Sequence, residues 1–265
     1  PTMGQRLSRA KAKIAAAGIP FAVPGPELWG ERLGSVLAVI YLIFNEGYAA
    51  TAGEEQLREA LCDEAIRLGR MLATLAPDAA EALGLLSLML TTHARRAART
   101  ASDGALVPLD RQDRARWDAG LIAEGAETLD RAIRLNQPGP YQIKAAIGAL
   151  HAQAPAYGRT DWRQIILLYD SLLVHEPSPV VRLNRAVALA EAGALDPALG
   201  ELAALEGALE SYQPYHAVRA DMLVRVGAGD AAAAAFRRAI ALSGTEAERR
   251  FIDARLQSIA PRAID

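Results

Sequence analysis

Cysteine, aromatic residues and long apolar runs are scarce in this sequence of 265 residues, and each shortage excludes a class of protein. The single cysteine, Cys62, leaves no pair for an internal disulfide and no cluster for a cysteine-based zinc site. The best apolar stretch, at 36–44, is far shorter than the roughly 20 residues of a membrane-spanning helix. We therefore expect a cytoplasmic protein without membrane contact.

Alanine, by contrast, is abundant. The chain holds 56 alanines but only 4 phenylalanines and 3 tryptophans. Alanine has the highest helix propensity, whereas aromatic and β-branched residues favour strands. Hydrophobic residues make up 51% of the chain and charged residues 23%, a balance typical of globular proteins. The composition predicts an all-α protein.

Apolar residues recur at helical spacing along most of the chain, and proline, glycine or polar loops separate the segments. The predicted helices lie at 27–46, 54–75, 79–101, 113–135, 140–154, 161–175, 179–192, 196–206, 213–226, 229–242 and 245–258. We divide them into a helical domain at 27–136 and a second domain at 137–259. A linker rich in proline and glycine, at 19–26, precedes both domains.

The second domain repeats itself with a period of 34 residues. Gly193 and Gly227 lie 34 residues apart, and each would end a helix. The same offset places Ala186 on Ala220, Leu189 on Leu223 and Leu202 on Phe236. This is the period of tetratricopeptide repeats, which stack helix pairs and commonly bind a peptide or another domain. We predict tetratricopeptide-like helical hairpins at 137–259, with a looser copy at 141–177.

Residues 1–20 differ in charge from the rest of the chain. They carry a net +4 and no acidic residue, which leaves −6 for the remainder of a chain whose total is −2. Apolar residues at helical spacing predict a short basic amphipathic helix that ends at Gly18. The chain opens on Pro1, and we expect it to be the later part of a longer protein.

Several sequence strings occur in a characteristic order. They are TMGQRLSRAKAKI at 2–14, GIPFAVP at 18–24, YLIFNEGY at 41–48, LCDEAIRL at 61–68, HARRAAR at 93–99, DRQDRARWD at 110–118, GPYQ at 139–142 and NRAVA at 184–188. Together they cover nearly the whole chain and resemble the extracytoplasmic-function class of RNA polymerase sigma factors, in the group with a long C-terminal extension. The string FNEGY is the most specific element.

The resemblance implies that this chain is the C-terminal part of a sigma factor, with 1–18 as the end of the helix that reads the −35 promoter element. The full-length protein would bind core RNA polymerase and promoter DNA. The helical extension would contact the protein's own upstream sigma domains or a regulatory protein. The implied DNA contacts are Gln5, Arg6, Arg9, Lys11 and Lys13. Without the first helix of the motif, this remnant should not read DNA sequence on its own.

The FNEGY string follows an apolar helix directly, and polar groups placed there are costly unless they are hydrogen-bonded. One interpretation is a helix C-terminus, with Gly47 in a left-handed conformation and Glu46 paired with an arginine. The other is a polar pocket for a ligand or a segment of another protein. Both interpretations stay open.

Opposite charges flank the loop at 102–108. Arg95, Arg96 and Arg99 precede it, and Asp110, Asp113, Arg114 and Asp118 follow it. We expect ion pairs between helices that extend toward Glu46, in a network that could also hold an anion. The predicted polar site comprises Asn45, Glu46, Arg95, Arg96, Asp113 and Arg114.

No pattern predicts catalysis, a metal or a cofactor. Asp63 and Glu64 are adjacent and so point about 100° apart around a helix. The four histidines form no pair at helical spacing, and neither a phosphate loop nor a dinucleotide or nucleophile motif is present. An α-helical enzyme would need a deep pocket with convergent titratable groups. The alternative to a sigma factor is therefore a stand-alone tetratricopeptide-like scaffold that binds a protein or peptide.

Overall fold

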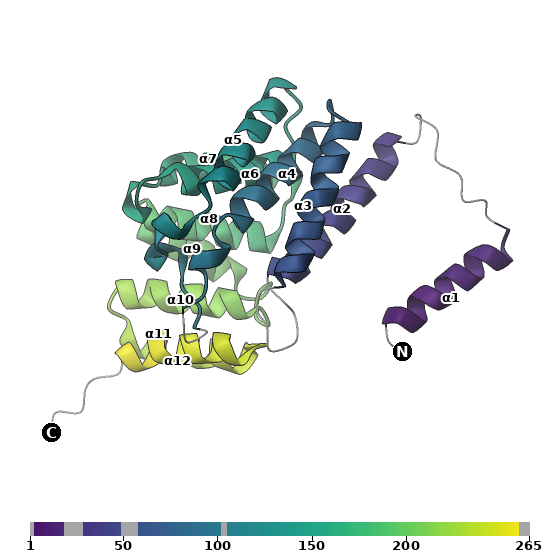
Figure 1. The fold of residues 1–265 in the computed structure, drawn as a ribbon. Coiled ribbons are helices and arrows are strands. Elements are labelled where there is room, and N and C mark those ends of the chain that lie inside the picture. Colours follow the sequence, from purple (N-terminus) through teal and green to yellow (C-terminus); the bar gives the residue numbers. More distant parts are fainter. Residues whose placement is uncertain (1–2, 19–28, 49–57, 102–104, 260–265) are drawn as a thin grey trace. The chain divides into compact units, whose positions relative to one another are not determined.

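The computed structural model describes residues 3–18, 29–48, 58–101 and 105–259. These residues form twelve α-helices, several 3-10 turns and an isolated β-bridge between Thr100 and Leu106, and they contain no strand (Figure 1). The helices are α1 (Met3–Ala16), α2 (Trp29–Tyr48), α3 (Glu59–Leu75), α4 (Ala80–His93), α5 (Ala119–Arg134), α6 (Pro140–Gln153), α7 (Trp162–His175), α8 (Pro179–Glu191), α9 (Leu195–Leu205), α10 (Gln213–Arg225), α11 (Gly229–Leu242) and α12 (Glu246–Ile259). The predicted all-α class is confirmed. None of the described helices is long and apolar enough to cross a membrane.

The contacts within the chain separate it into two units, residues 1–39 and residues 40–265. The first unit contains the predicted basic helix as α1, and Gly18 follows it with a φ of 61°. This left-handed conformation is a common helix end at glycine, as the sequence predicts. The predicted linker at 19–26 lies outside the described residues.

Helix α4 organises the first part of the second unit, because it packs on α3, α5 and α6. Small residues allow these close contacts. A Cβ added to Gly84 would lie 2.6 Å from the backbone nitrogen of Gln142 in α6. A Cβ added to Gly125 of α5 would lie 2.8 Å from Cγ2 of Thr91 in α4. The contact of α4 with α6 crosses the predicted domain boundary at 136/137, which itself stays a prediction.

A carboxylate reinforces the contact between α4 and α6. Glu81 of α4 accepts hydrogen bonds from the backbone N–H groups of Tyr141 (2.9 Å) and Gln142 (3.0 Å) in the first turn of α6. A helix leaves its first N–H groups without internal partners, and its N-terminus attracts negative charge. Glu81 therefore fixes the start of α6 from a position 60 residues earlier in the chain.

The pairs α8–α9 and α10–α11 show the predicted 34-residue period. Gly193 and Gly227 have φ values of 89° and 75°. In both turns, the residue after the glycine donates to the carbonyl five residues before it, at 2.9 Å. These bonds define two matching Schellman caps. Equivalent positions are also equally buried, as in Ala186 and Ala220, Ala198 and Ala232, and Leu202 and Phe236. Helices α10, α11 and α12 continue the packing side by side (Figure 1).

The predicted helix over 79–101 is too long. Helix α4 ends at His93, and Arg96–Ala98 form only a 3-10 turn. A contact from a remote segment helps to set this end, because the carbonyl of Ala94 accepts a hydrogen bond from the N–H of Asp118 at 2.9 Å. No proline or glycine marks the position in the sequence.

The predicted helix over 113–135 starts too early. Helix α5 begins at Ala119, because the carboxylate of Asp118 accepts a hydrogen bond from the N–H of Leu121 at 3.1 Å and caps the helix. The preceding Arg114–Arg116 form a 3-10 turn. The segment between α4 and α5 is thus a folded connection that brings charged side chains to the ends of several helices.

Candidate functional site

The predicted polar site lies at the end of α2, on the turn after α4 and on the segment before α5. The pairing of Glu46 with an arginine is confirmed, since Nη1 of Arg58 lies 2.9 Å from Oε1 of Glu46. Both side chains are partly exposed, and such a pair contributes about 0–1 kcal/mol. Asn45, which precedes Glu46 in the sequence, is half-buried.

The predicted left-handed conformation of Gly47 is wrong. Helix α2 continues through Gly47 to Tyr48, and Gly47 has no positive φ. Its hydrogen side chain instead permits close packing, because an added Cβ would lie 2.8 Å from both the backbone nitrogen and Sγ of Cys62 in α3. Cys62 is fully buried, and burial raises the pKa of its thiol to about 11. The thiol is therefore protonated at neutral pH.

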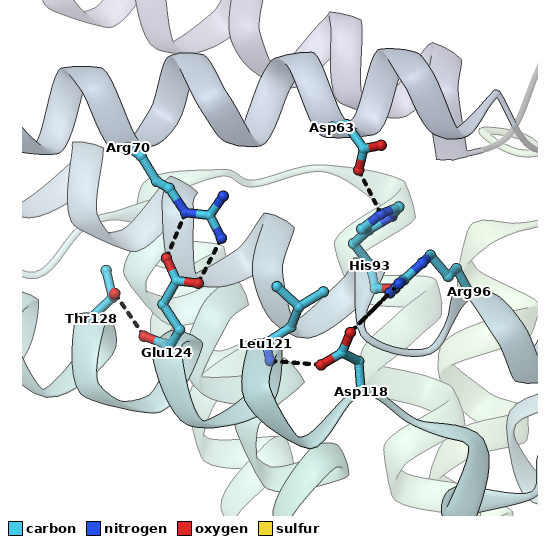
Figure 2. A network of polar contacts seen from close by, with 8 residues as sticks. All are labelled: Asp63, Arg70, His93, Arg96, Asp118, Leu121, Glu124 and Thr128. Carbon is cyan, nitrogen blue, oxygen red and sulfur yellow. Dashed lines mark hydrogen bonds and ion pairs between the residues drawn. The ribbon is translucent and has the colours of Figure 1, made fainter.

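Figure 2 shows two acid–base pairs that connect α3 with its neighbours. Arg70 donates two hydrogen bonds to Glu124 of α5, at 2.7 and 2.6 Å. Nε2 of His93 lies 3.1 Å from Oδ1 of Asp63. The His93 side chain is 4% exposed, and its burial lowers its pKa, so the ring is neutral near pH 7 and Nε2–H donates to Asp63. These contacts connect α3 with α4 and α5.

The predicted ion pairing across the loop is confirmed for Arg96 and Asp118, whose closest atoms lie 3.5 Å apart (Figure 2). The other carboxylate oxygen of Asp118 caps α5 through the N–H of Leu121. That hydrogen bond, together with the charge of Arg96, lowers the pKa of Asp118. Asp118 therefore ties the turn after α4 to the first turn of α5.

The predicted ion pairs of Asp113 and Arg114 are wrong for the described residues. The carboxylate of Asp113 accepts from the backbone N–H of Ala115 at 3.0 Å and caps the 3-10 turn. Nη1 of Arg114 donates to the carbonyls of His151 (2.7 Å) and Ala154 (2.9 Å), at the end of α6. The end of a helix leaves carbonyls without internal partners, and Arg114 supplies a donor to them.

Arg95 and Arg99 lie against Tyr48, the last residue of α2. The guanidinium carbon of Arg99 is 3.4 Å from the centroid of the Tyr48 ring, and Nη1 donates to the Tyr48 carbonyl at 2.7 Å. Nη2 of Arg95 reaches the Tyr48 hydroxyl at 3.5 Å. Arg95 and Arg114 both lie over the ring of Trp117, at 5.9 and 4.3 Å from its centroid. We call Arg95, Arg99 and Arg114 the arginine cluster.

Burial acts against the charges of two members of the arginine cluster, Arg99 and Arg114. Burial, and then the nearby charge of Arg95, lower the pKa values of Arg99 and Arg114. Burial together with the charges of Arg95 and Arg114 lowers the pKa of His151 to about 4. The His151 ring is thus neutral at physiological pH. Arg95 therefore lies close to the partly desolvated Arg99 and Arg114 and to a neutral imidazole.

The sequence places Arg99 in the predicted charged network, but the predicted polar site does not include Tyr48, His151 or Trp117. Trp117 is buried, and the guanidinium groups over its ring make it part of the site. The strings FNEGY and HARRAAR contained the signal, since they include Tyr48 and Arg99. The contact between Tyr48 and Arg99 joins residues 51 positions apart, so it depends on the path of the chain between them and cannot be predicted from either string alone.

A second feature is a cavity of about 330 Å³ lined by α2, α4, α6, α7 and α8. Lys144 and Glu176 form an ion pair of 2.8 Å at this cavity, and Nζ of Lys144 lies 5.8 Å from the ring centroid of Tyr41. Burial raises the pKa of Tyr169, another lining residue, to about 12. The apolar part of the lining is Leu88, Ile147, Leu172, Val180 and Val181. The residues that line the cavity are far apart in the sequence, so no local sequence pattern predicts the cavity.

Helix α1 carries the residues for which DNA contacts are predicted. The side chains of Gln5, Arg9, Lys11 and Lys13 are exposed, and Nε of Arg9 donates to the carbonyl of Gln5 at 3.3 Å. The side chain of Arg6 lies outside the described residues. The role of all five in DNA binding stays a prediction. In the part of the chain that the structure describes, no group of three or more His, Cys, Asp or Glu could hold a metal ion.

Two comparisons with known proteins bear on this arrangement. Residues 32–133 match the model of a family described as "Family of unknown function (DUF6596)". The matched stretch includes the whole arginine cluster. The chain is also 46% identical over 258 residues to "Uncharacterized protein R00370" of Rhizobium meliloti (strain 1021). That alignment covers 97% of this chain but 61% of the relative, which therefore contains sequence that this chain lacks.

Proposed function

We propose that this chain is the C-terminal part of an extracytoplasmic-function sigma factor. The observation that carries the proposal is the ordered set of strings, from the basic segment at 2–14 through FNEGY to NRAVA at 184–188. The exposed basic side chains of α1 agree with a helix that approaches DNA. The relative, of which this chain spans 61%, is long enough to contain further domains.

In the complete protein, the upstream domains bind core RNA polymerase, and α1 completes the helix that enters the major groove at the −35 element. Gln5, Arg6 and Arg9 approach bases or phosphates, and Lys11 and Lys13 lie nearer the backbone. The helices from 40 to 259 form an interaction domain that contacts the upstream sigma domains or a regulatory protein. Such a protein acts in the cytoplasm, where its polymerase and promoters are.

The test uses the full-length protein with core polymerase from the same organism. We expect the protein to co-purify with core polymerase and to direct run-off transcription from its promoter. Arg9→Ala should lower promoter-directed transcription roughly tenfold and leave polymerase binding unchanged, because one contact to DNA is lost. Arg163→Ala is the matched control, since Arg163 is an exposed arginine on α7. A full-length protein that neither binds core polymerase nor starts transcription would refute the proposal.

A stand-alone protein- or peptide-binding scaffold is the second candidate, and the cavity beside Lys144 favours it. Its apolar lining and charged pair resemble the pockets that hold a small ligand or an anchoring side chain. Peptides selected on the immobilised chain should lose binding to a Lys144→Glu variant and keep binding to an Arg163→Glu variant. Peptides that bind both variants equally well would place recognition elsewhere.

A further inference from the structure

The arginine cluster concentrates positive charge that no carboxylate of the described residues pairs with. Among the described residues, no carboxylate lies within ion-pair distance of Arg95, Arg99 or Arg114, whereas Arg58, Arg70 and Arg96 each meet one. Arg95 joins the other two, because it shares Tyr48 with Arg99 and Trp117 with Arg114. Like charges held together at partly buried positions repel one another, so an anion between them would stabilise the fold.

Buried donors beside the cluster also lack acceptors. Trp117 is 7% exposed, and its indole Nε1–H has no hydrogen-bond partner in the described structure. Nη2 of Arg114, whose guanidinium stacks on that indole, is buried and has no partner either. Nδ1 of the neutral His151 ring, which is a donor or an acceptor according to the tautomer, is a third buried polar atom without a partner in the described structure. A buried donor without an acceptor costs about 1–3 kcal/mol. Two such donors, on the stacked side chains of Trp117 and Arg114, therefore indicate that an acceptor completes the site.

We propose that Arg95, Arg99 and Arg114 bind a phosphate group, either as inorganic phosphate or as part of a small phosphomonoester. A phosphate carries about −1.5 to −2 charges and presents at least three strong acceptor oxygens, which suits three guanidinium groups and an indole N–H. A carboxylate offers two oxygens and a single charge, which leaves part of this donor set unfilled. The site is open to a ligand, because Tyr48 and Arg95 are only partly buried.

The experiment titrates the isotope-labelled chain with inorganic phosphate at constant ionic strength and follows the tryptophan indole N–H signals by NMR. The Trp117 signal is assigned with a Trp117→Phe variant. We expect this signal to shift saturably, while the signals of Trp29 and Trp162 stay in place. Titration with glycerol 2-phosphate distinguishes the two sources of the phosphate group, and titration with acetate tests a carboxylate.

Arg95→Ala is the deciding variant, because among the described residues the one hydrogen bond of the Arg95 side chain is the long contact with the Tyr48 hydroxyl at 3.5 Å. It should weaken phosphate binding roughly tenfold or more, since it removes a charge-assisted contact. Arg116→Ala, an exposed arginine on the same segment, should leave the affinity within about twofold. The spectra themselves report whether each variant is folded, and Arg95→Gln provides a second variant that retains most of the side chain.

Each outcome either supports or overturns the proposal. Saturable shifts of Trp117 that depend on Arg95 support it, with inorganic phosphate or glycerol 2-phosphate identified by the tighter binding. A Trp117 signal that does not move at millimolar phosphate overturns it, as does equal binding by Arg95→Ala and the wild type. Equal responses to acetate and phosphate overturn the choice of a phosphate group. A response to duplex DNA alone would replace a small phosphate with nucleic acid.

Discussion

The helix pairs at 179–259 and the helices at 40–135 are both all-α, but different kinds of contact hold them together. In the pairs, each helix packs mainly on its neighbours in the chain, and equal glycine caps join them. In the earlier part, side chains reach the backbone of remote elements, as Arg99 does at Tyr48 and Arg114 does at the end of α6. Local contacts follow from sequence periodicity, whereas these long-range contacts do not.

The largest effect is expected from Gly84→Ala, which breaks a long-range contact. The added Cβ would lie 2.6 Å from the backbone of Gln142 and force α4 away from α6, at a cost of about 3 kcal/mol in the free energy of unfolding. Urea denaturation followed by circular dichroism measures this loss. Gly200→Ala in α9 is the control: nothing lies within 4 Å of its added Cβ, and it should gain about 0.5–1 kcal/mol. Similar losses in both variants would contradict the close packing of α4 on α6.

Arg114→Ala should cost about 2–3 kcal/mol of stability, because it leaves two carbonyls at the end of α6 without their charged donor. Thermal and urea unfolding of the variant measure the loss. Arg116→Ala, two residues along on the same turn, should change stability by less than about 0.5 kcal/mol. If the two substitutions had equal effects, the link from Arg114 to α6 would contribute nothing to stability.

Acidification should weaken the contact between the segment before α5 and the end of α6 through His151. Its folded pKa of about 4 lies below the unfolded value of about 6.5, so the unfolded chain binds more protons between these values. Stability contributed at pH 7 is therefore lost as pH falls, by at most about 2 kcal/mol at pH 5. His151→Gln should flatten this part of the pH profile of unfolding, and His175→Gln, at an exposed position, should not. If the stability of the wild type and of His151→Gln changed in parallel with pH, His151 would not be the group responsible.

The smallest effects are expected at the two caps of the repeated pairs. Gly193→Ala and Gly227→Ala each place a side chain in a left-handed conformation, at a cost of about 1 kcal/mol. Because the two caps have the same hydrogen bonds, their losses in urea denaturation should agree within about 0.5 kcal/mol. A large loss at one glycine and none at the other would show that the pairs are not equivalent in energy.

Sequence reasoning predicts the features that depend on local chemistry. Alanine content and apolar spacing indicate the helices, and a glycine at the end of such a segment indicates a left-handed cap at Gly18, Gly193 and Gly227. The 34-residue offset predicts which positions of the pairs share burial, such as Ala186 and Ala220. These inferences succeed because each helix pair is a nearly self-contained unit.

The same reasoning fails where remote segments decide. The end of α4 is fixed partly by a bond between Ala94 and Asp118, and nothing local at either residue announces it. A glycine such as Gly47 is typical of a helix end, but here it lies inside α2 and allows Cys62 of α3 to pack against the backbone of α2. The prediction that Glu46 pairs with an arginine is confirmed, but which arginine it is, Arg58, depends on the path of the chain into α3.

The matching turns at Gly193 and Gly227 bear on how this protein can change in length. A duplicated segment 194–227 would bring its own cap and would offer its neighbours the same buried positions as the original. Gene duplication or deletion could therefore lengthen or shorten this region by one hairpin without inventing a new interface. The helices before it have no such freedom, since losing α6 would strip Glu81 and Arg114 of their partners at once.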